Sequence, residues 1–465
     1  MSATSRLLKT CFTLSLALAT GCVAPLHIST CQLNSSLLAR TGVDLGPNES
    51  DCDLAFDDWV EFEDGLSEEE AISIGVWNNP AYRELLADLQ ITRADILIAA
   101  QLPNPRVSTM FPVGVKQFEL ALTVPLDALC LRPLRVSAAE LESQRVAERL
   151  VQDGLNLVRD IRFAYIDWQL AAQRAKLSEE GAALRSEIGR IAEARLAAGD
   201  VAELDVSAIQ LEALVGQGEV IRATHDLELA RERLRYVLGL QLSDSPLEFS
   251  PISEPQVPDL DVQELVTEAV SSRPDLRAIQ LAVDAAQSRA ELVRRDIWQL
   301  AGILPDINGR GFKGFEAGPG LQINIPLFHQ NQGEIAKARA DAQRLQSQFV
   351  NRRDLAAMEV KRAHIQLTQA KKEVEIWRDQ ILPQAEKASS QSRAALGEDG
   401  VSPLLVLETT RQLIATQQRA AEANGQLRRA IAELERSVGR RLFTVAEAPH
   451  VKVLPPSVAV RRISP

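Results

Sequence analysis

The clearest pattern in the chain is a small or apolar residue repeated at alternating intervals of four and three. Such a heptad pattern is typical of a coiled-coil helix that faces its partner along one seam. The first seam follows a break at 199–205 and occupies Ile209, Ala213, Gly216, Val220, Ala223, Leu227, Ala230, Leu234 and Val237. A second seam keeps the register at Leu413, Thr416, Ala420, Ala423, Leu427, Ala430, Leu434 and Ser437. Because many seam residues are small, we expect helix backbones that pack closely side by side.

The two seams belong to an internal duplication. Landmarks near the first break recur 200 residues later, where Val201, Leu204 and Val206 match Val401, Leu404 and Val406. The segment "NNPAYR" at 78–83 matches "SRPDLR" at 272–277, and "TVPLD" at 123–127 matches "NIPLF" at 324–328. The sequence therefore predicts one unit of about 200 residues that occurs twice.

Each unit also contains a much longer helix. A third seam precedes the first break, at Val158, Ile161, Tyr165, Trp168, Ala172 and Ala175. We expect one helix from 133 to 198 and its counterpart from 331 to 396. A helix of about 65 residues is about 100 Å long. Each long helix turns at a tip, near 199–205 or 397–403, and returns as a shorter helix, so each unit contains a helical hairpin.

A different period appears just before each long helix. Every second residue is apolar at Phe118, Leu120, Leu122, Val124 and Leu126, and again at Leu321, Ile323, Ile325 and Leu327. This alternation predicts strands with one apolar face. We expect two strands in each insert, as hairpins at 103–126 and 303–328. Weak alternation over about ten residues is typical of strands in membrane barrels.

These patterns give a mainly α fold with a small β part, made of duplicated coiled-coil hairpins and four strands per chain. The predicted segments are a signal peptide at 1–21, an N-terminal arm at 22–65, repeat 1 at 66–241, a linker at 242–261, repeat 2 at 262–440 and a C-terminal tail at 441–465. The arm and the tail show no regular pattern, so we expect both to be irregular.

Composition and charge narrow the function. The chain has 51 Lys and Arg against 63 Asp and Glu, a net charge of −12, which argues against nucleic acid as a partner. No apolar run after residue 22 is long enough for a membrane-spanning helix. The five His are scattered, and no spacing typical of a hydrolase, a phosphate-binding loop or a metal site occurs. We therefore expect no enzyme activity, no cofactor and no metal site.

The N-terminus has the pattern of an export signal. Arg6 and Lys9 precede a short apolar run, and "LATGC" at 18–22 resembles a bacterial lipobox. The resemblance implies that Cys22 carries lipid and begins the mature protein; the alternative is an ordinary signal peptide cleaved nearby. In an oxidising compartment a disulfide between Cys31 and Cys52 is one possibility, and two unpaired thiols are the other.

The chain as a whole resembles the TolC-like outer-membrane efflux proteins, over most of residues 66–440. The resemblance rests on the duplication, on "LSEEEAISIGVWNNPAYR" at 66–83, on the tip "EARLAAGDVAELDV" at 193–206 and on "IPLFHQNQGEIAKARA" at 325–340, which is most similar to the heavy-metal efflux branch. It implies a homotrimer whose twelve strands form an outer-membrane barrel continued by a long periplasmic stalk. It also implies docking to a periplasmic adaptor and an inner-membrane pump. The chain would then be a passive exit duct.

The resemblance places docking and closure at the two tips. The docking residues it implies are Arg195, Gly199, Val201, Leu204, Gly400, Val401 and Leu404. Acidic side chains at the tips could form cation-favouring rings in a trimer, or serve only as solvated turn and capping residues; they are Asp200, Asp205, Glu398 and Asp399. Two other functions stay open: a lipid-anchored periplasmic coiled-coil protein without a pore, and a type I protein-secretion duct.

The sequence departs from the family pattern at several points. The strand exit "PLF" is present at 326–328, but repeat 1 reads "PLDALCLRPLRV" at 125–136. The strand inserts are short, and the first strand, near 106–111, is below the usual length for a membrane strand. The second tip, "ALGEDGVSPLL" at 395–405, carries an additional Gly-Glu-Asp turn.

Overall fold

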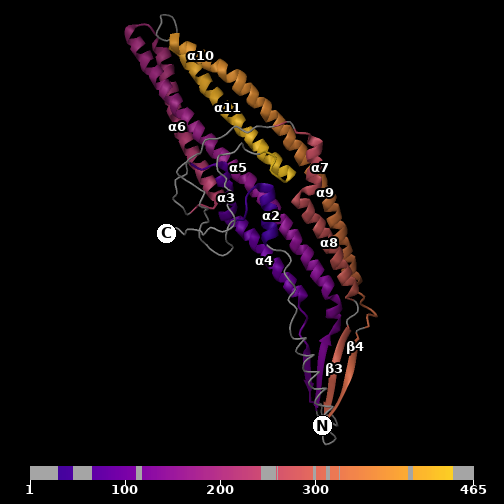
Figure 1. Cartoon of the computed structure of the whole chain (residues 1–465). Coiled ribbons are helices and arrows are strands. Elements are labelled where there is room, and N and C mark those ends of the chain that lie inside the picture. Colours follow the sequence, from indigo (N-terminus) through magenta and orange to yellow (C-terminus); the bar gives the residue numbers. More distant parts are fainter. Residues whose placement is uncertain are drawn as a thin grey trace. The chain divides into compact units, whose positions relative to one another are not determined.

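The structure is a computed structural model that describes residues 30–45, 65–111, 118–241, 258, 260–296, 300–309, 315–323, 325–395 and 402–443. Helices dominate it, and the same order of elements occurs twice (Figure 1). Repeat 1 consists of α3 (Glu68–Asn78), α4 (Pro80–Ala100), β1 (Arg106–Met110), β2 (Phe118–Pro125), α5 (Leu126–Ala198) and α6 (Glu203–Leu238). The predicted fold class, mainly α with duplicated hairpins and four strands, is confirmed.

Repeat 2 follows the same plan with one irregular turn. Its elements are α7 (Val262–Ser272), α8 (Pro274–Arg295), β3 (Leu300–Gly309), β4 (Phe315–Ile323), α9 (Gln332–Ile376), the π-helical turn η3 (Trp377–Ile381), α10 (Leu382–Ala394) and α11 (Pro403–Val438). Ahead of both repeats lies α2 (Thr30–Thr41). The arm at 22–65 was expected to be irregular, and this helix corrects that expectation.

The chain divides into two compact units. One unit holds the sheet together with residues 85–150 and 274–353, and the other contains residues 34–84, 151–273 and 354–465. None of the helices in the described part of the chain combines the length and apolar character needed to cross a membrane.

The first unit is built around an antiparallel sheet in the order β1-β2-β3-β4. Its central pair, β2 with β3, joins the two repeats, and Phe118 lies opposite Gly309. The register shifts between Ala121 and Thr123 in that pair and again in the pair β3 with β4. Such irregularities bend a strand and increase its twist. Strands β1 and β4 each pair on one side only, so the sheet of one chain ends in two edges.

The ends of the strands differ from the sequence prediction in repeat 2. The strand was expected to include Ile325 and Leu327, but β4 ends at Ile323. Pro326 has no N–H group to donate to a neighbouring strand, so the ladder stops before it. Ile325, Leu327 and Phe328 are exposed, and the Phe328 side chain is 94% exposed.

The long helix of repeat 1 starts earlier than predicted. We expected it to begin at Pro133, but α5 begins at Leu126, directly after β2, and includes this proline. A proline inside a helix removes one backbone hydrogen bond and leaves a carbonyl without its usual donor. Arg135 Nη2 donates to the Ala128 carbonyl at 2.9 Å, and Arg132 Nε donates to the Ala100 carbonyl at 2.7 Å. Both arginine side chains thus donate hydrogen bonds to backbone carbonyls near the proline.

The long helix of repeat 2 was expected to be regular from 331 to 396, and it is interrupted instead. At η3 the Leu382 N–H donates to the Trp377 carbonyl, five residues back. Pro383 follows immediately, and its ring excludes the carbonyl of the residue four positions earlier from an ordinary helical turn. The wider π-helical turn accommodates this, and the chain continues as α10.

In the second unit, each repeat bends at the same dipeptide position. Asn79 and Arg273 stand between two helices, each before a proline that opens the second helix, and both have extended backbone angles. Asn79 Nδ2 donates to the Val237 carbonyl at 2.8 Å, and Arg273 Nη1 donates to the Ser437 carbonyl at 2.9 Å. The two acceptors are 200 residues apart, so one junction is made twice with different chemistry. The buried Arg273 also pairs with Glu359, at 2.9 Å.

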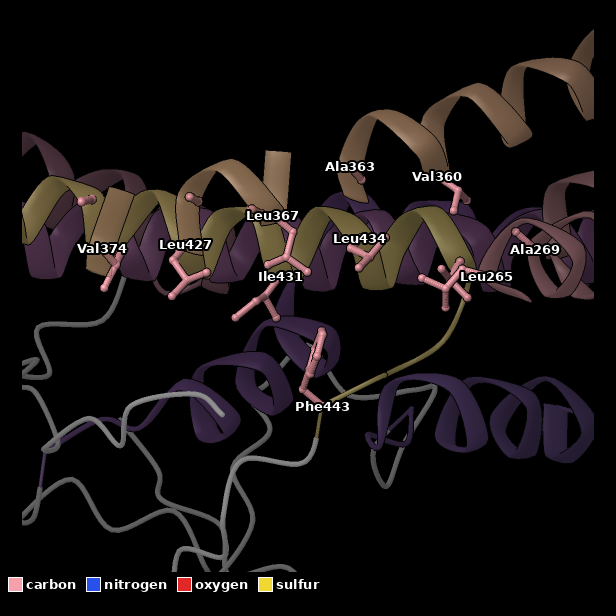
Figure 2. Close-up of a cluster of buried hydrophobic side chains, with 14 residues drawn as sticks. Leu265, Ala269, Val360, Ala363, Leu367, Val374, Leu427, Ile431, Leu434 and Phe443 are labelled. Carbon is pink, nitrogen blue, oxygen red and sulfur yellow. The ribbon is translucent and has the colours of Figure 1, made fainter. Parts of the chain in front are cut away.

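The predicted seams form the core of the second unit. Figure 2 shows the cluster where α7, α9 and α11 meet, lined by Leu265, Ala269, Val360, Ala363, Leu367, Val374, Leu427, Ile431 and Leu434, with Phe443 beside them. Every residue of the three predicted seams is buried or half-buried. The heptad prediction is therefore confirmed on α5, α6 and α11.

A buried ion network joins the two repeats within the second unit. The Arg162 guanidinium of α5 pairs with Glu435 of α11, and its Nε lies 3.2 Å from Glu68 of α3. Glu68 also accepts from Arg428 Nη2 at 2.5 Å. Burial alone would lower the pKa of Arg162, but the surrounding carboxylates outweigh burial and raise it. Arg162 is therefore held charged inside the protein.

The paired glycines at helix ends allow a matched test. Gly239 and Gly199 both have left-handed backbones, with φ of 76° and 85°. A side chain at Gly239 would overlap the Asn78 carbonyl, whereas Gly199 has nothing within 4 Å of that position. We expect Gly199→Ala to cost about 1 kcal/mol and Gly239→Ala about 3 kcal/mol in unfolding free energy. Chemical denaturation of the two variants checks this; equal losses would contradict the close packing.

The ion network makes a second prediction. Arg162→Met leaves Glu435 and Glu68 without their buried partner, so we expect a loss of about 3 to 5 kcal/mol in unfolding free energy. Adding Glu435→Gln should recover part of that loss, because it removes one of the stranded charges. Denaturation of the single and double variants measures the difference, with Arg190→Met, which breaks an exposed pair with Glu187, as a near-neutral control. A double variant less stable than the single one would disprove the coupling.

Candidate functional site

The first tip is a tight turn at the end of α5. Gly199 N–H donates to the Leu196 carbonyl at 3.0 Å, and Asp200 N–H donates to the Arg195 carbonyl at 2.9 Å. With Gly199 left-handed, these bonds form a Schellman motif, which ends a helix by satisfying its last carbonyls. Arg195 and Gly199 therefore have a structural role at this tip whatever else they do.

An apolar cluster fixes this tip against the second hairpin. It consists of Ile188, Ala192, Val206, Ile209, Val406 and Leu407, from α5, α6 and α11, with Val201 packed against it. Leu204 points away from the cluster and is 80% exposed. An apolar side chain held in water at the end of a rigid hairpin is available for contact with another molecule.

The predicted acidic residues of the first tip occupy different environments. Asp200 is exposed in the turn, whereas Asp205 is half-buried in the first turn of α6, beside Glu203. Negative charge is favourable at a helix N-terminus, so Asp205 fits the capping alternative as well as it fits an acidic ring. Nearby on α5, a hydrogen bond from Arg190 lowers the pKa of Glu187.

Only part of the second tip lies within the described residues. Glu398, Asp399, Gly400 and Val401 lie outside them. On the described side, Ser402 caps α11 by accepting from the Leu404 N–H at 3.2 Å. Leu404 is 43% exposed and, like Leu204 200 residues earlier, stands in the first turn of its helix.

The sheet is the other candidate site. Its two edge strands present backbone N–H and C=O groups with no partner strand in the sheet. Strand β1 is exposed along its length, and β2 is half-buried along its length. Four strands of five, eight, ten and nine residues are long enough to pair with further strands on either side.

The structure does not test the predictions about the cysteines. Cys22 and Cys52 lie outside the described residues, and Cys31 is placed within α2 by its backbone alone. Cys130 is a free, exposed thiol near the start of α5. Among the described residues, no group of three or more His, Cys, Asp or Glu side chains is placed to hold a metal ion.

Comparison with known proteins supports the predicted resemblance. Residues 265–440, which include most of repeat 2, match the family described as outer membrane efflux protein. The predicted resemblance to outer-membrane efflux proteins is therefore confirmed, together with the outer-membrane location and the general function of an efflux channel.

Relatives of this efflux protein agree with that assignment. It is 25% identical over 394 residues to the cobalt-zinc-cadmium resistance protein CzcC of Cupriavidus metallidurans, covering 81% of this chain and 90% of the relative. Its fold matches the outer-membrane channel OprN with a TM-score of 0.68 at 19% identity, covering 85% of this chain and 98% of that one. It also matches CusC, whose structures concern transmembrane channel formation, with a TM-score of 0.67 at 17% identity, covering 85% and 99%.

The sequence analysis did not identify the buried ion pairs that stabilise the second unit of this efflux protein. Arg162, Glu435 and Arg273 are buried and paired, and none of them was singled out. A signal was present, because Arg162 directly follows the seam residue Ile161 and Glu435 directly follows Leu434. Charged residues beside seam positions on two different helices are candidates for a buried pair.

Helix α2 was also missed, and it closes the junction region of the second unit. Arg40 donates to the Gly439 carbonyl at 2.9 Å and to the Ser272 carbonyl at 2.8 Å, at the ends of α11 and α7. Leu37 is fully buried against Gly154 of α5. The helix is short and has few apolar positions, so it shows no repeated seam that the sequence analysis could have recognised.

Proposed function

We propose that three copies of this efflux protein close their sheets into one twelve-stranded barrel in the outer membrane. The helices continue the barrel as a periplasmic duct, and the tips dock to a periplasmic adaptor coupled to an inner-membrane pump. The protein is passive: the pump supplies the energy, and the chain supplies a path and a gate. Lipid on Cys22 anchors the N-terminal arm to the same membrane.

The observation that carries this proposal is the sheet with two unpaired edges. Backbone groups left unpaired in lipid cost several kcal/mol each, so a sheet can enter a membrane only when it closes. Strands β1 and β4 pair on one side each. Four strands are too few for a closed barrel, since known outer-membrane barrels have at least eight. Additional copies of the chain supply the missing strands in the simplest way.

Divalent metal cations are the substrate class that we propose. The relative CzcC is named for cobalt, zinc and cadmium resistance. The exposed Asp200 and the acidic residues at 398 and 399 would be repeated three times around the axis of a trimer, and rings of carboxylates favour cations. Among the described residues there is no metal-ligating cluster, which suits a duct that passes ions without retaining them.

A duct predicts ion conductance by the purified protein. Reconstituted in planar bilayers, the full chain should form trimers and conduct, with cations preferred over anions. Asp200→Asn combined with Glu398→Gln and Asp399→Asn should reduce the cation preference several-fold at low salt, because screening is weak there. A folded monomer without conductance would refute the duct and favour the structural alternative.

Docking at the tips predicts a separate effect. Leu204→Asp together with Leu404→Asp should weaken binding of the adaptor about tenfold or more, because exposed apolar contacts at an interface core are replaced by charge. Binding is measured with a purified periplasmic adaptor that binds the wild-type chain, and single-channel conductance is measured as well. Ser207→Asp, an exposed position on α6 one turn from the tip, serves as the control. Unchanged adaptor affinity in the double variant would place docking elsewhere.

A further inference from the structure

The helix pairs of the two repeats differ where they approach the sheet. In repeat 1, buried apolar residues continue to the end of α4 and the start of α5, at Ile96, Ala100 and Leu131. In repeat 2, the last buried residue of α8 is Ala286, and the first buried residue of α9 is Ala356. The described ends of α8 and α9 next to the sheet therefore lack the packed core that repeat 1 has at the same place.

The seam of α9 continues through this end, but its composition changes. Its buried positions follow intervals of four and three at Ala356, Val360, Ala363 and Leu367. The same intervals, extended toward the sheet, fall on Arg353, Phe349, Gln346, Ala342, Arg339 and Ile335. Arg339 and Gln346 thus occupy positions where a seam normally has apolar side chains, and both are exposed.

A groove of about 480 Å³ lies between the two helices at this end. One side is a face of α8 from Gln287 to Arg294, and the other is a face of α9 from Ile335 to Gln346. Helix α8 leads into β3, and α9 follows β4 (Figure 1). The lining residues and both strands belong to the same compact unit, so the groove is the part of this helix pair that adjoins the sheet.

The groove carries positive charge that the chain itself does not balance. Arg294 lines it from α8 and Arg339 from α9, and neither has an ion pair or a hydrogen bond among the described residues. Glu291 also lines the groove, but its carboxylate lies 2.7 Å from Arg295, which neutralises it. Two guanidinium groups that border one space repel each other, so an anion between them is favourable.

The polar groups of the lining match the chemistry of a phosphate group. A guanidinium group donates paired hydrogen bonds to phosphate oxygens, and such charge-assisted bonds are stronger than neutral ones. The side-chain amides of Gln287, Gln343 and Gln346 supply additional N–H donors around the two arginines. The groove therefore offers donors from both helices to one anionic ligand.

The size and position of the groove favour a phosphate that is carried by a lipid. Pockets of roughly 300 to 1,000 Å³ hold ligands as large as a drug molecule, so free phosphate would fill only a small part of this one. Ala290, Ile335 and Ala342 add apolar surface for the glycerol and the first methylene groups. Basic pockets between helices close to a membrane bind anionic lipid headgroups.

We infer that this groove binds the phosphate headgroup of an anionic phospholipid of the outer membrane. The inference rests on the proposed barrel, because the sheet in the membrane brings the groove to the lipid. The bound headgroup joins α8 to α9 next to the sheet. It thus takes the place of the packed core that α4 and α5 have in repeat 1.

Lipid titration of the purified full chain tests this assignment. Phosphatidylglycerol is added to the detergent-solubilised protein, and native mass spectrometry measures the bound fraction. Arg294→Gln with Arg339→Gln should lower the affinity about tenfold or more, because both charged donors are lost. Lys337→Gln with Arg344→Gln removes the same charge from exposed positions of α9 outside the groove and should change the affinity less than twofold. Equal losses in the two double variants, or no saturable binding to the wild type, would overturn the inference.

Inorganic phosphate is the second arm of the experiment and distinguishes the two sources of the ligand. Added in tenfold excess, it should displace only a small part of the bound phosphatidylglycerol. If free phosphate instead binds as tightly as the lipid does, the lipid assignment is wrong. Circular dichroism of each variant verifies that its helices are folded.

Conductance in planar bilayers separates this inference from the proposed duct. A wild type that conducts as a trimer but shows no saturable lipid binding would refute the inference and leave the duct in place. A wild type that binds lipid through Arg294 and Arg339 but never conducts would refute the duct and leave the phosphate site in place.

Discussion

A buried guanidinium shared by two carboxylates connects the halves of this protein. Arg162 comes from repeat 1 and Glu435 from the last helix of repeat 2, and burial makes the loss of either partner costly. Because this contact fixes α11 against α5, the two hairpins of the second unit form one body and not two separate rods. The apolar cluster at Ile188 and Val406 continues the same interface toward the tip. The proposed docking at the tips would need that rigidity, since a partner can recognise both hairpins only if their spacing is fixed.

The sheet differs from the helical hairpins in how its backbone hydrogen bonds are satisfied. Helical hairpins satisfy their own backbone hydrogen bonds, whereas β1 and β4 leave theirs unmet on one side. The sheet of one chain is therefore incomplete, and the proposed barrel would complete it with strands from further copies.

Strong periodicity explains how much of the fold could be predicted. The seams through Ile209, Leu413 and Val158 repeat over many turns, so their burial was evident from spacing alone. The predicted boundaries of helices and strands were wrong near three prolines. The strand before Pro326 ends early, α5 begins before Pro133 and includes it, and a π-helical turn precedes Pro383. The ion network could not be found from one helix at a time, because Arg162 and Glu435 are distant in sequence and meet only in the folded chain.

The two proline junctions give the duplicated halves different chemistry. Asn79 holds its junction through a neutral amide that donates to the Val237 carbonyl. Arg273 holds the equivalent junction through a buried charge that Glu359 balances. The second junction therefore depends on a charged partner from another helix, whereas the first needs only a backbone acceptor. Two hairpins of similar shape are thus held by different kinds of contact.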